Sequence, residues 1–196
     1  EMVWGLGYRF THDRAASTFT FSLDPDRRGS HLFSAFLQDD IALVAQKLHL
    51  ILGSEFEHND YTNFEFQPNA RLLWMPRDRH TAWAAISRAV RIPSRTDDDV
   101  RLVLQTFPPD SLFQDSPSAL LVGIGNRDLE AEKLLAFELG YRARPADNLA
   151  LDLAGFYNRY ADLRTGRIGN PLSEDTPEPA HTLLPFVAVN ELEGET

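Results

Sequence analysis

The sequence has no cysteine, no excess of basic residues and no long apolar run, and each absence excludes a class of protein. Without cysteine, the 196 residues form no disulfide framework and offer no thiol chemistry. The formal net charge of −10 argues against a nucleic-acid-binding protein, which needs a basic face to replace the counterions of the phosphates. No run approaches the ~20 apolar residues of a membrane-spanning helix.

Alternation of apolar and polar residues with a period of two runs through much of the chain, whereas helical periodicity is weak. In the run LHLILGSEF, for example, Leu48, Leu50 and Leu52 fall on one side of an extended chain. The pattern predicts an all-β protein in which about eight long strands form an antiparallel up-and-down meander. The expected strands are 3–11, 31–44, 48–58, 63–75, 80–92, 133–144, 149–161 and 183–193.

The lengths of these strands and of their connections point to a membrane barrel. Most of the strands exceed the ~5–6 residues usual in soluble proteins, and they match the ~9–11 residues of a tilted strand that crosses a bilayer. Short turns at 45–47, 76–79 and 145–148 lie at one end, and the longer connections lie at the other. Outer-membrane barrels have this asymmetry, with short periplasmic turns and long outer loops.

Three tryptophans support the same interpretation. Trp74 and Trp83 flank the turn PRDRH, and Trp4 begins the first expected strand. All three are therefore expected at the turn-side rim of the sheet, as an aromatic girdle at one membrane interface requires.

The alternation also assigns the two faces of the sheet. The apolar phase is expected to face lipid, and the polar phase is expected to face the lumen of the barrel. The outer set is Leu50, Leu52, Leu72, Leu139, Tyr141, Leu151 and Leu153. The lumen set is Glu55, Glu57, Asn69, Arg71, Glu138, Arg142, Asp152 and Asn158.

Four stretches, in this order over about residues 31–165, resemble consecutive barrel hairpins of TonB-dependent outer-membrane receptors. They are FSAFLQDDIAL, LILGSEFEHNDYTNFEFQPNARLLWMP, HTAWAAISRAVRIPSR and EKLLAFELGYRARPADNLALDLAGFYNRYADLR. The resemblance implies a ~22-stranded barrel plugged by a separate domain. It also implies TonB-driven uptake of a scarce nutrient across the bacterial outer membrane, with an iron–siderophore complex as the expected cargo.

On this resemblance, residues 1–196 are expected to be a middle portion of the barrel domain, with the plug domain and the terminal strands absent. The implied partners are outer-membrane lipid, the plug domain, TonB through parts outside this chain, and a small-molecule metal chelate. No nucleic-acid partner, no cofactor and no enzymatic activity are expected.

The connection 93–132 is the best candidate for a ligand-binding loop, because a simple connector does not need such length. The run Asp97–Asp99 is interpreted as a solvated loop tip, with an acidic recognition surface as the alternative. The apolar runs VRLVLQTF and SALLVGIGN are expected to form a hairpin above the membrane. The candidate ligand-binding residues are Arg91, Arg95, Asp97, Asp98, Asp99, Phe107 and Phe113.

Neither a metal site nor a catalytic set is predicted. The six histidines lack metal-ligand spacing, and no Ser-His-Asp arrangement is visible in the sequence. An outer-membrane lipase or protease is disfavoured for this reason. A soluble β-sandwich that serves as a binding or adhesion module remains the alternative function.

Detergent dependence distinguishes a barrel from a sandwich. A barrel strand keeps one apolar face for lipid, whereas a sandwich buries that face in its own core. We expect the protein to aggregate without detergent and to run as a single species with it, as measured by size-exclusion chromatography with light scattering. A single monodisperse species in plain buffer would contradict the barrel.

Overall fold

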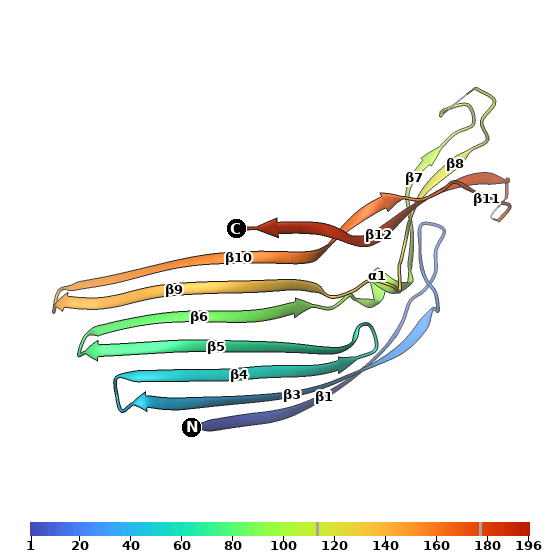
Figure 1. The fold of residues 1–196 in the computed structure, drawn as a ribbon. Coiled ribbons are helices and arrows are strands. Elements are labelled where there is room, and N and C mark those ends of the chain that lie inside the picture. Colours follow the sequence, from blue (N-terminus) through green and yellow to red (C-terminus); the bar gives the residue numbers. More distant parts are fainter. Residues whose placement is uncertain (113, 177) are drawn as a thin grey trace.

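The computed structural model describes residues 1–112, 114–176 and 178–196. These residues form a single 12-stranded sheet and one short helix, with tight turns at one end and long connections at the other (Figure 1). The elements are β1 (Met2–Arg14), β2 (Phe21–Leu23), β3 (Arg27–Val44), β4 (Leu48–Asn59), β5 (Asn63–Arg77), β6 (His80–Arg91), α1 (Arg95–Asp99), β7 (Val100–Phe107), β8 (Ala119–Ile124), β9 (Glu132–Ala146), β10 (Leu149–Ile168), β11 (Leu172–Glu174) and β12 (His181–Glu195).

The eight expected strands are confirmed as the long strands of the sheet, in the nearest-neighbour order β1-β3-β4-β5-β6-β9-β10-β12. All neighbours in this series are antiparallel. The turns are fixed locally: Gln46 and Arg79 adopt positive φ. In the β4–β5 turn, the Asn59 side-chain oxygen accepts the backbone N–H groups of Tyr61 and Thr62, both at 2.9 Å.

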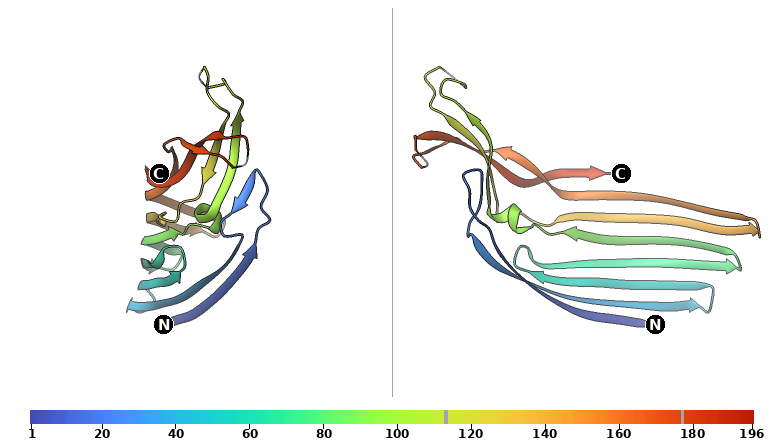
Figure 2. Two further views of the ribbon diagram at one scale, coloured as in Figure 1. Left: turned by 90° about the vertical axis from the view of Figure 1, so that its right-hand side faces the viewer. Right: turned by 180° about the vertical axis from the view of Figure 1, so that it is seen from behind.

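Four shorter strands were not counted in the sequence, so the expected number of about eight is too low. β7 and β8 form the expected hairpin, which projects beyond the main sheet (Figures 1 and 2). The expectation of wholly antiparallel pairing is wrong at one place, because β8 pairs in parallel with β12. Val122 and Leu183 are almost completely buried where these strands meet, so a small apolar core holds the hairpin on β12.

The two faces of the sheet follow the expected alternation. Directly paired residues point to the same side of an antiparallel ladder, and Leu50 pairs with Leu72 while Tyr141 pairs with Leu153. The whole outer set shares this apolar face, and Leu139 is 67% exposed on it. The lumen set lies on the opposite, polar face, where Arg142 binds Asp152 at 2.6 Å.

Only part of the expected tryptophan girdle is correct. Trp4 and Trp74 lie on the apolar face, but Trp4 pairs with Leu37 in the middle of β3, far from the turn. Trp83 lies on the polar face, where its ring covers Gly140 so closely that a Cβ at this position would stand 2.0 Å from it. The three side chains therefore do not form one ring at the turn end.

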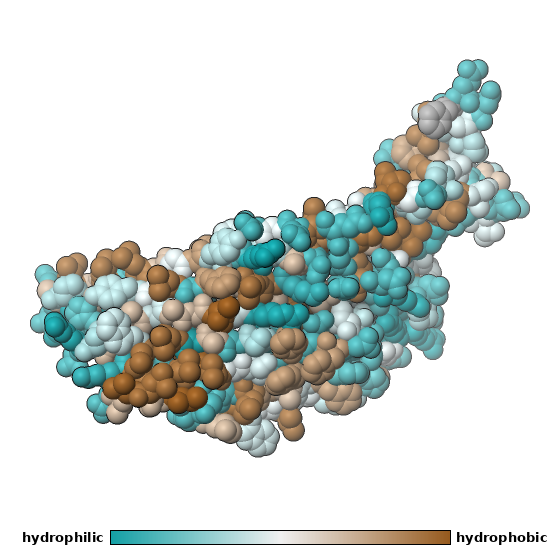
Figure 3. Space-filling view, viewed as in Figure 1, coloured by the Kyte–Doolittle hydropathy of each residue, from teal (hydrophilic) through white to brown (hydrophobic). Residues whose placement is uncertain are grey.

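Large apolar side chains remain exposed along the strands. On the face seen in Figure 3, hydrophobic residues gather over the turn-side half of the sheet, and hydrophilic residues gather where the strands pass into the long connections. Within the described residues, no helix is both long enough and apolar enough to cross a membrane.

The assignment of faces can be tested by cysteine labelling in membranes. We expect single cysteines at Leu139 and Leu153 to resist a water-soluble maleimide, because lipid covers them, whereas cysteines at Glu138 and Asp152 react. Labelling is quantified by gel shift of the intact protein. Fast labelling at 139 and 153 together with protection at 138 and 152 would show that the faces are reversed.

Candidate functional site

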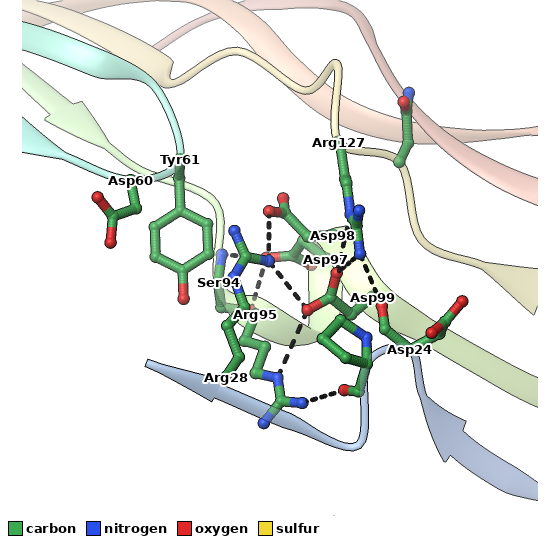
Figure 4. Close-up of polar contacts among 12 residues, drawn as sticks. Asp24, Arg28, Asp60, Tyr61, Ser94, Arg95, Asp97, Asp98, Asp99 and Arg127 are labelled. Carbon is green, nitrogen blue, oxygen red and sulfur yellow. Dashed lines mark hydrogen bonds and ion pairs between the residues drawn. The ribbon is translucent and has the colours of Figure 1, made fainter. Parts of the chain in front are cut away.

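The long connections meet at one end of the sheet through a cluster of ion pairs (Figure 4). We call it the ion-pair cluster. Its side chains come from β1, β3, α1, the β8–β9 connection and β10, so it links segments that are distant in the sequence. Its members are Asp13, Arg28, Arg95, Asp97, Asp98, Asp99, Arg127 and Arg164.

Helix α1 presents the three consecutive aspartates in different directions. It begins after Ser94, whose backbone N–H and hydroxyl both donate to a side-chain oxygen of Asp97, at 2.8 and 2.9 Å. It ends at Asp99, because Val100 is already extended and starts β7. Successive helical residues point about 100° apart, so one short turn directs carboxylates towards several arginines at once.

Asp99 is the centre of the cluster, and its side chain is completely buried. Its carboxylate accepts a hydrogen bond from Arg28 at 2.9 Å, and it accepts two from Arg127 at 2.7 and 3.0 Å. Arg95 lies 3.5 Å away. Asp98 binds the same Arg28 nitrogen at 3.0 Å. A buried carboxylate requires such partners, because an unpaired buried charge is strongly unfavourable.

Three further contacts extend the cluster to the neighbouring strands. Arg95 pairs with Asp13 of β1 and donates to the backbone oxygen of Pro25 in the β1–β3 connection. Arg164 of β10 pairs with Asp97. The connections of several hairpins are thereby held in one arrangement.

The pKa values of the two neighbouring aspartates shift in opposite directions. Burial raises the pKa of Asp98, and the hydrogen bond from Arg28 offsets this only in part. Burial also acts to raise the pKa of Asp99, but hydrogen bonds from Arg28 and Arg127 outweigh it and lower the pKa below its ordinary value. Asp99 therefore stays ionised in the cluster, whereas Asp98 takes up a proton more readily.

The candidate residues identified in the sequence do not all lie together. Arg95, Asp97, Asp98 and Asp99 are in the cluster, so the interpretation of the acidic run as a solvated loop tip is wrong. Arg91 instead pairs with Glu132 at 2.7 Å. Phe107 is at the far end of β7, half-buried, and Phe113 lies outside the described residues. Contact of any of these side chains with a ligand stays a prediction.

The sequence reasoning missed Arg28, Arg127 and Arg164. One signal was present, because each lies in or beside a connection assigned to the same end of the sheet as the aspartates. Within residues 1–112, 114–176 and 178–196, no group of three or more histidine and acidic side chains is placed to hold a metal ion. Chemically, the cluster can fix the positions of the connections, because guanidinium groups already satisfy its carboxylates.

The central role of Asp99 can be tested by exchanging it and its neighbour for asparagine. We expect Asp99→Asn to destabilise the loop end by about 3 kcal/mol, because the buried guanidinium groups of Arg28 and Arg95 each lose one of two carboxylate partners and Arg127 loses the one with which it pairs. Hydrogen exchange of the α1 and β7 amides in the intact protein measures the effect. Asp98→Asn is the matched control, and we expect a much smaller change because burial already favours its neutral form. Equal effects of the two substitutions would refute a centre at Asp99.

The pKa shifts also give a dependence on pH. Because the folded pKa of Asp99 is lowered, its stabilisation is present above the unfolded pKa of about 3.9 and is lost as the pH falls through the folded value. Asp98 has the opposite sign, since its raised pKa means that protonation favours the folded state. We expect exchange at α1 to accelerate on acidification below about pH 4, and this acceleration should be absent in Asp99→Asn.

The model of the TonB dependent receptor-like β-barrel family matches residues 2–195. The siderophore receptor PirA from Acinetobacter baumannii has a similar structure, with a TM-score of 0.75 and 16% identity over 99% of this chain and 30% of that receptor. A mutant of the ferric enterobactin receptor PfeA from Pseudomonas aeruginosa, in complex with enterobactin, also has a similar structure. Its TM-score is 0.68, with 22% sequence identity over 100% of this chain and 30% of that receptor.

PirA from Pseudomonas aeruginosa gives a TM-score of 0.63 and 18% identity over 87% of this chain and 30% of that receptor. At these identities the likeness shows the fold alone, and the chain spans less than a third of each of these receptors. No curated protein matches the sequence. Because the family model covers nearly all of its residues, the chain belongs to the TonB-dependent receptor family and forms part of the receptor β-barrel.

Proposed function

We propose that the chain forms one section of the wall, and much of the outer ligand surface, of an outer-membrane receptor that takes up an iron–siderophore complex. In this proposal residues 1–196 belong to the barrel domain, and a plug domain and TonB act through other parts of the receptor. The apolar face contacts outer-membrane lipid. The proposal is supported by family membership and by the receptors with similar structures, which are named for siderophores or ferric enterobactin.

The observation that carries the proposal is the convergence of the long connections on the ion-pair cluster. A binding surface made of loops is effective when the loops are ordered before the ligand arrives, because less conformational entropy is then lost on binding. The buried carboxylate of Asp99 supplies this order at the base of the loops. The β7–β8 hairpin is anchored separately by its core at Val122 and Leu183.

This arrangement separates residues that support the loops from residues that reach a ligand. Arg95 and Asp99 are buried in ion pairs, so in our proposal they hold the loops in place. The ligand surface would then lie further out, on the β7–β8 hairpin that carries Phe107. The half-buried ring of Phe107 at the far end of β7 offers an apolar surface on which a bulky chelate can pack.

The soluble β-sandwich does not fit the structure. A sandwich needs two sheets packed face to face, whereas the described strands form one sheet. Its large apolar side chains would face water, and Leu139 and Leu153 of the apolar face are 67% and 57% exposed. A lipid-facing wall explains this exposure.

The proposal can be tested by replacing the tip of the hairpin, residues 108–118, with a short Gly-Ser turn in the full-length receptor. The change leaves both the ion-pair cluster and the core on β12 in place. We expect binding of a ferric siderophore to weaken about tenfold or more, as measured by isothermal titration with a panel of ferric catecholate and hydroxamate siderophores.

A matched control replaces residues 147–148 in the tight β9–β10 turn, at the opposite end of the sheet. Heat-modifiable migration on gels verifies that both variants still assemble as barrels. If the receptor binds no member of the panel, the proposal that it takes up a siderophore is wrong. If it binds and the hairpin variant binds equally well, the ligand surface lies elsewhere.

A further inference from the structure

The apolar face of β1 changes in character along the strand. Successive side chains on this face run from apolar through aromatic to basic as β1 approaches the loop end. They are Trp4, Leu6, Tyr8, Phe10, His12 and Arg14. β1 pairs with β3 without any register shift, so the gradient is continued by the facing residues of β3.

Aromatic rings form a continuous exposed band in the middle of this gradient. Tyr8 lies against Phe33 with ring centroids 4.8 Å apart, and Phe10 lies against His31 at 4.9 Å. The Tyr8 hydroxyl and His31 Nδ1 are 3.0 Å apart. The band continues over β4 and β5, and it lines a shallow groove. The groove is bordered by Leu6, Tyr8, Phe33, Ala35, Phe56 and Phe64.

Arg14 and Arg27 lie just beyond the band, directly opposite each other in the register of β1 and β3. Both are exposed, and within the described residues neither guanidinium group has a carboxylate partner. Asp13 and Asp26 are adjacent to these arginines in the sequence. Asp13 pairs with Arg95 instead, and among the described residues the Asp26 carboxylate forms no ion pair with either arginine. Like charges directly opposite each other on neighbouring strands destabilise a sheet. An anion bound between the two guanidinium groups would offset this repulsion.

The neighbouring arginines at the loop end do have carboxylate partners, so the absence of one for Arg14 and Arg27 is unusual there. Arg28 follows Arg27 but points to the other face, where Asp98 and Asp99 neutralise it. Arg95 is likewise paired, with Asp13. The chain has a net charge of −10, and yet the two arginines that rise above the apolar face have no acidic partner.

We propose that Arg14 and Arg27 bind the phosphate of a phosphorylated lipid whose acyl chains lie against the aromatic band. Two guanidinium forks side by side match the oxygens of a phosphate. Phe10 and Arg14 are about 13 Å apart along the strand. This separation suits a lipid, whose chains, interface and phosphate follow one another in the same order. Free phosphate would use the arginines but would leave the aromatic groove without a role.

This inference rests on the proposed membrane location, and it is tested on the full-length receptor in a neutral detergent. Native mass spectrometry measures the binding of diphosphoryl lipid A, of the same lipid without its phosphates, and of inorganic phosphate. We expect the phosphorylated lipid to bind at least about tenfold more tightly than the other two. The double variant Arg14→Gln/Arg27→Gln should lose this preference.

The control variant Arg77→Gln/Arg144→Gln removes the same charge from two exposed arginines near the turn end, and we expect it to bind lipid as the native receptor does. Equal binding by the two double variants, or equal binding of lipids with and without phosphate, overturns the inference. If inorganic phosphate binds tightly and the phosphorylated lipid does not, the proposal that a lipid occupies the site is overturned. Siderophore binding and detergent dependence are measured on the same samples, so a failure of the proposed function is recognised separately.

Discussion

The unbroken antiparallel ladder from β1 to β10 is the constraint on which the rest of the structure depends. In such a ladder the register of one residue fixes the face of every residue paired with it. Leu50, Leu72 and Leu139 share a face for this reason, although they lie on three different strands. The same constraint brings the tight β3–β4, β5–β6 and β9–β10 turns to one end, and it brings the long connections together at the other.

Several long connections meet at one end of the sheet, and the ion-pair cluster holds them in one arrangement. Buried ion pairs contribute little net stability, because desolvation offsets much of the attraction, but breaking one of them is strongly unfavourable. A cluster built on Asp99 therefore selects one arrangement of the loops more than it stabilises the fold. The parallel pairing of β8 with β12 adds an apolar contact at Val122 and Leu183, so the hairpin is held by two independent means.

The distribution of apolar residues is the reverse of that in a soluble domain. The buried apolar core of the described residues is small and belongs to the loop end, whereas large apolar and aromatic side chains are exposed along the strands. If the apolar face is the outer wall of a barrel, lipid covers the exposed apolar side chains. The aromatic band and the two unpaired arginines above it then mark the level at which the wall leaves the membrane.

The sequence by itself determined the strands, the tight turns and the two faces of the sheet, because alternation and turn residues such as Asn59 act within a few positions of the chain. Resemblance in the ordered stretches from FSAFLQDDIAL onwards gave the family. Only the tertiary structure decided that Asp99 is buried among arginines, that Trp83 lies on the polar face, and that β8 joins β12 in parallel. Each of these depends on which distant residues meet, and the approach of Arg28 and Arg127 to Asp99 is set by the pairing of whole strands, which no local pattern encodes.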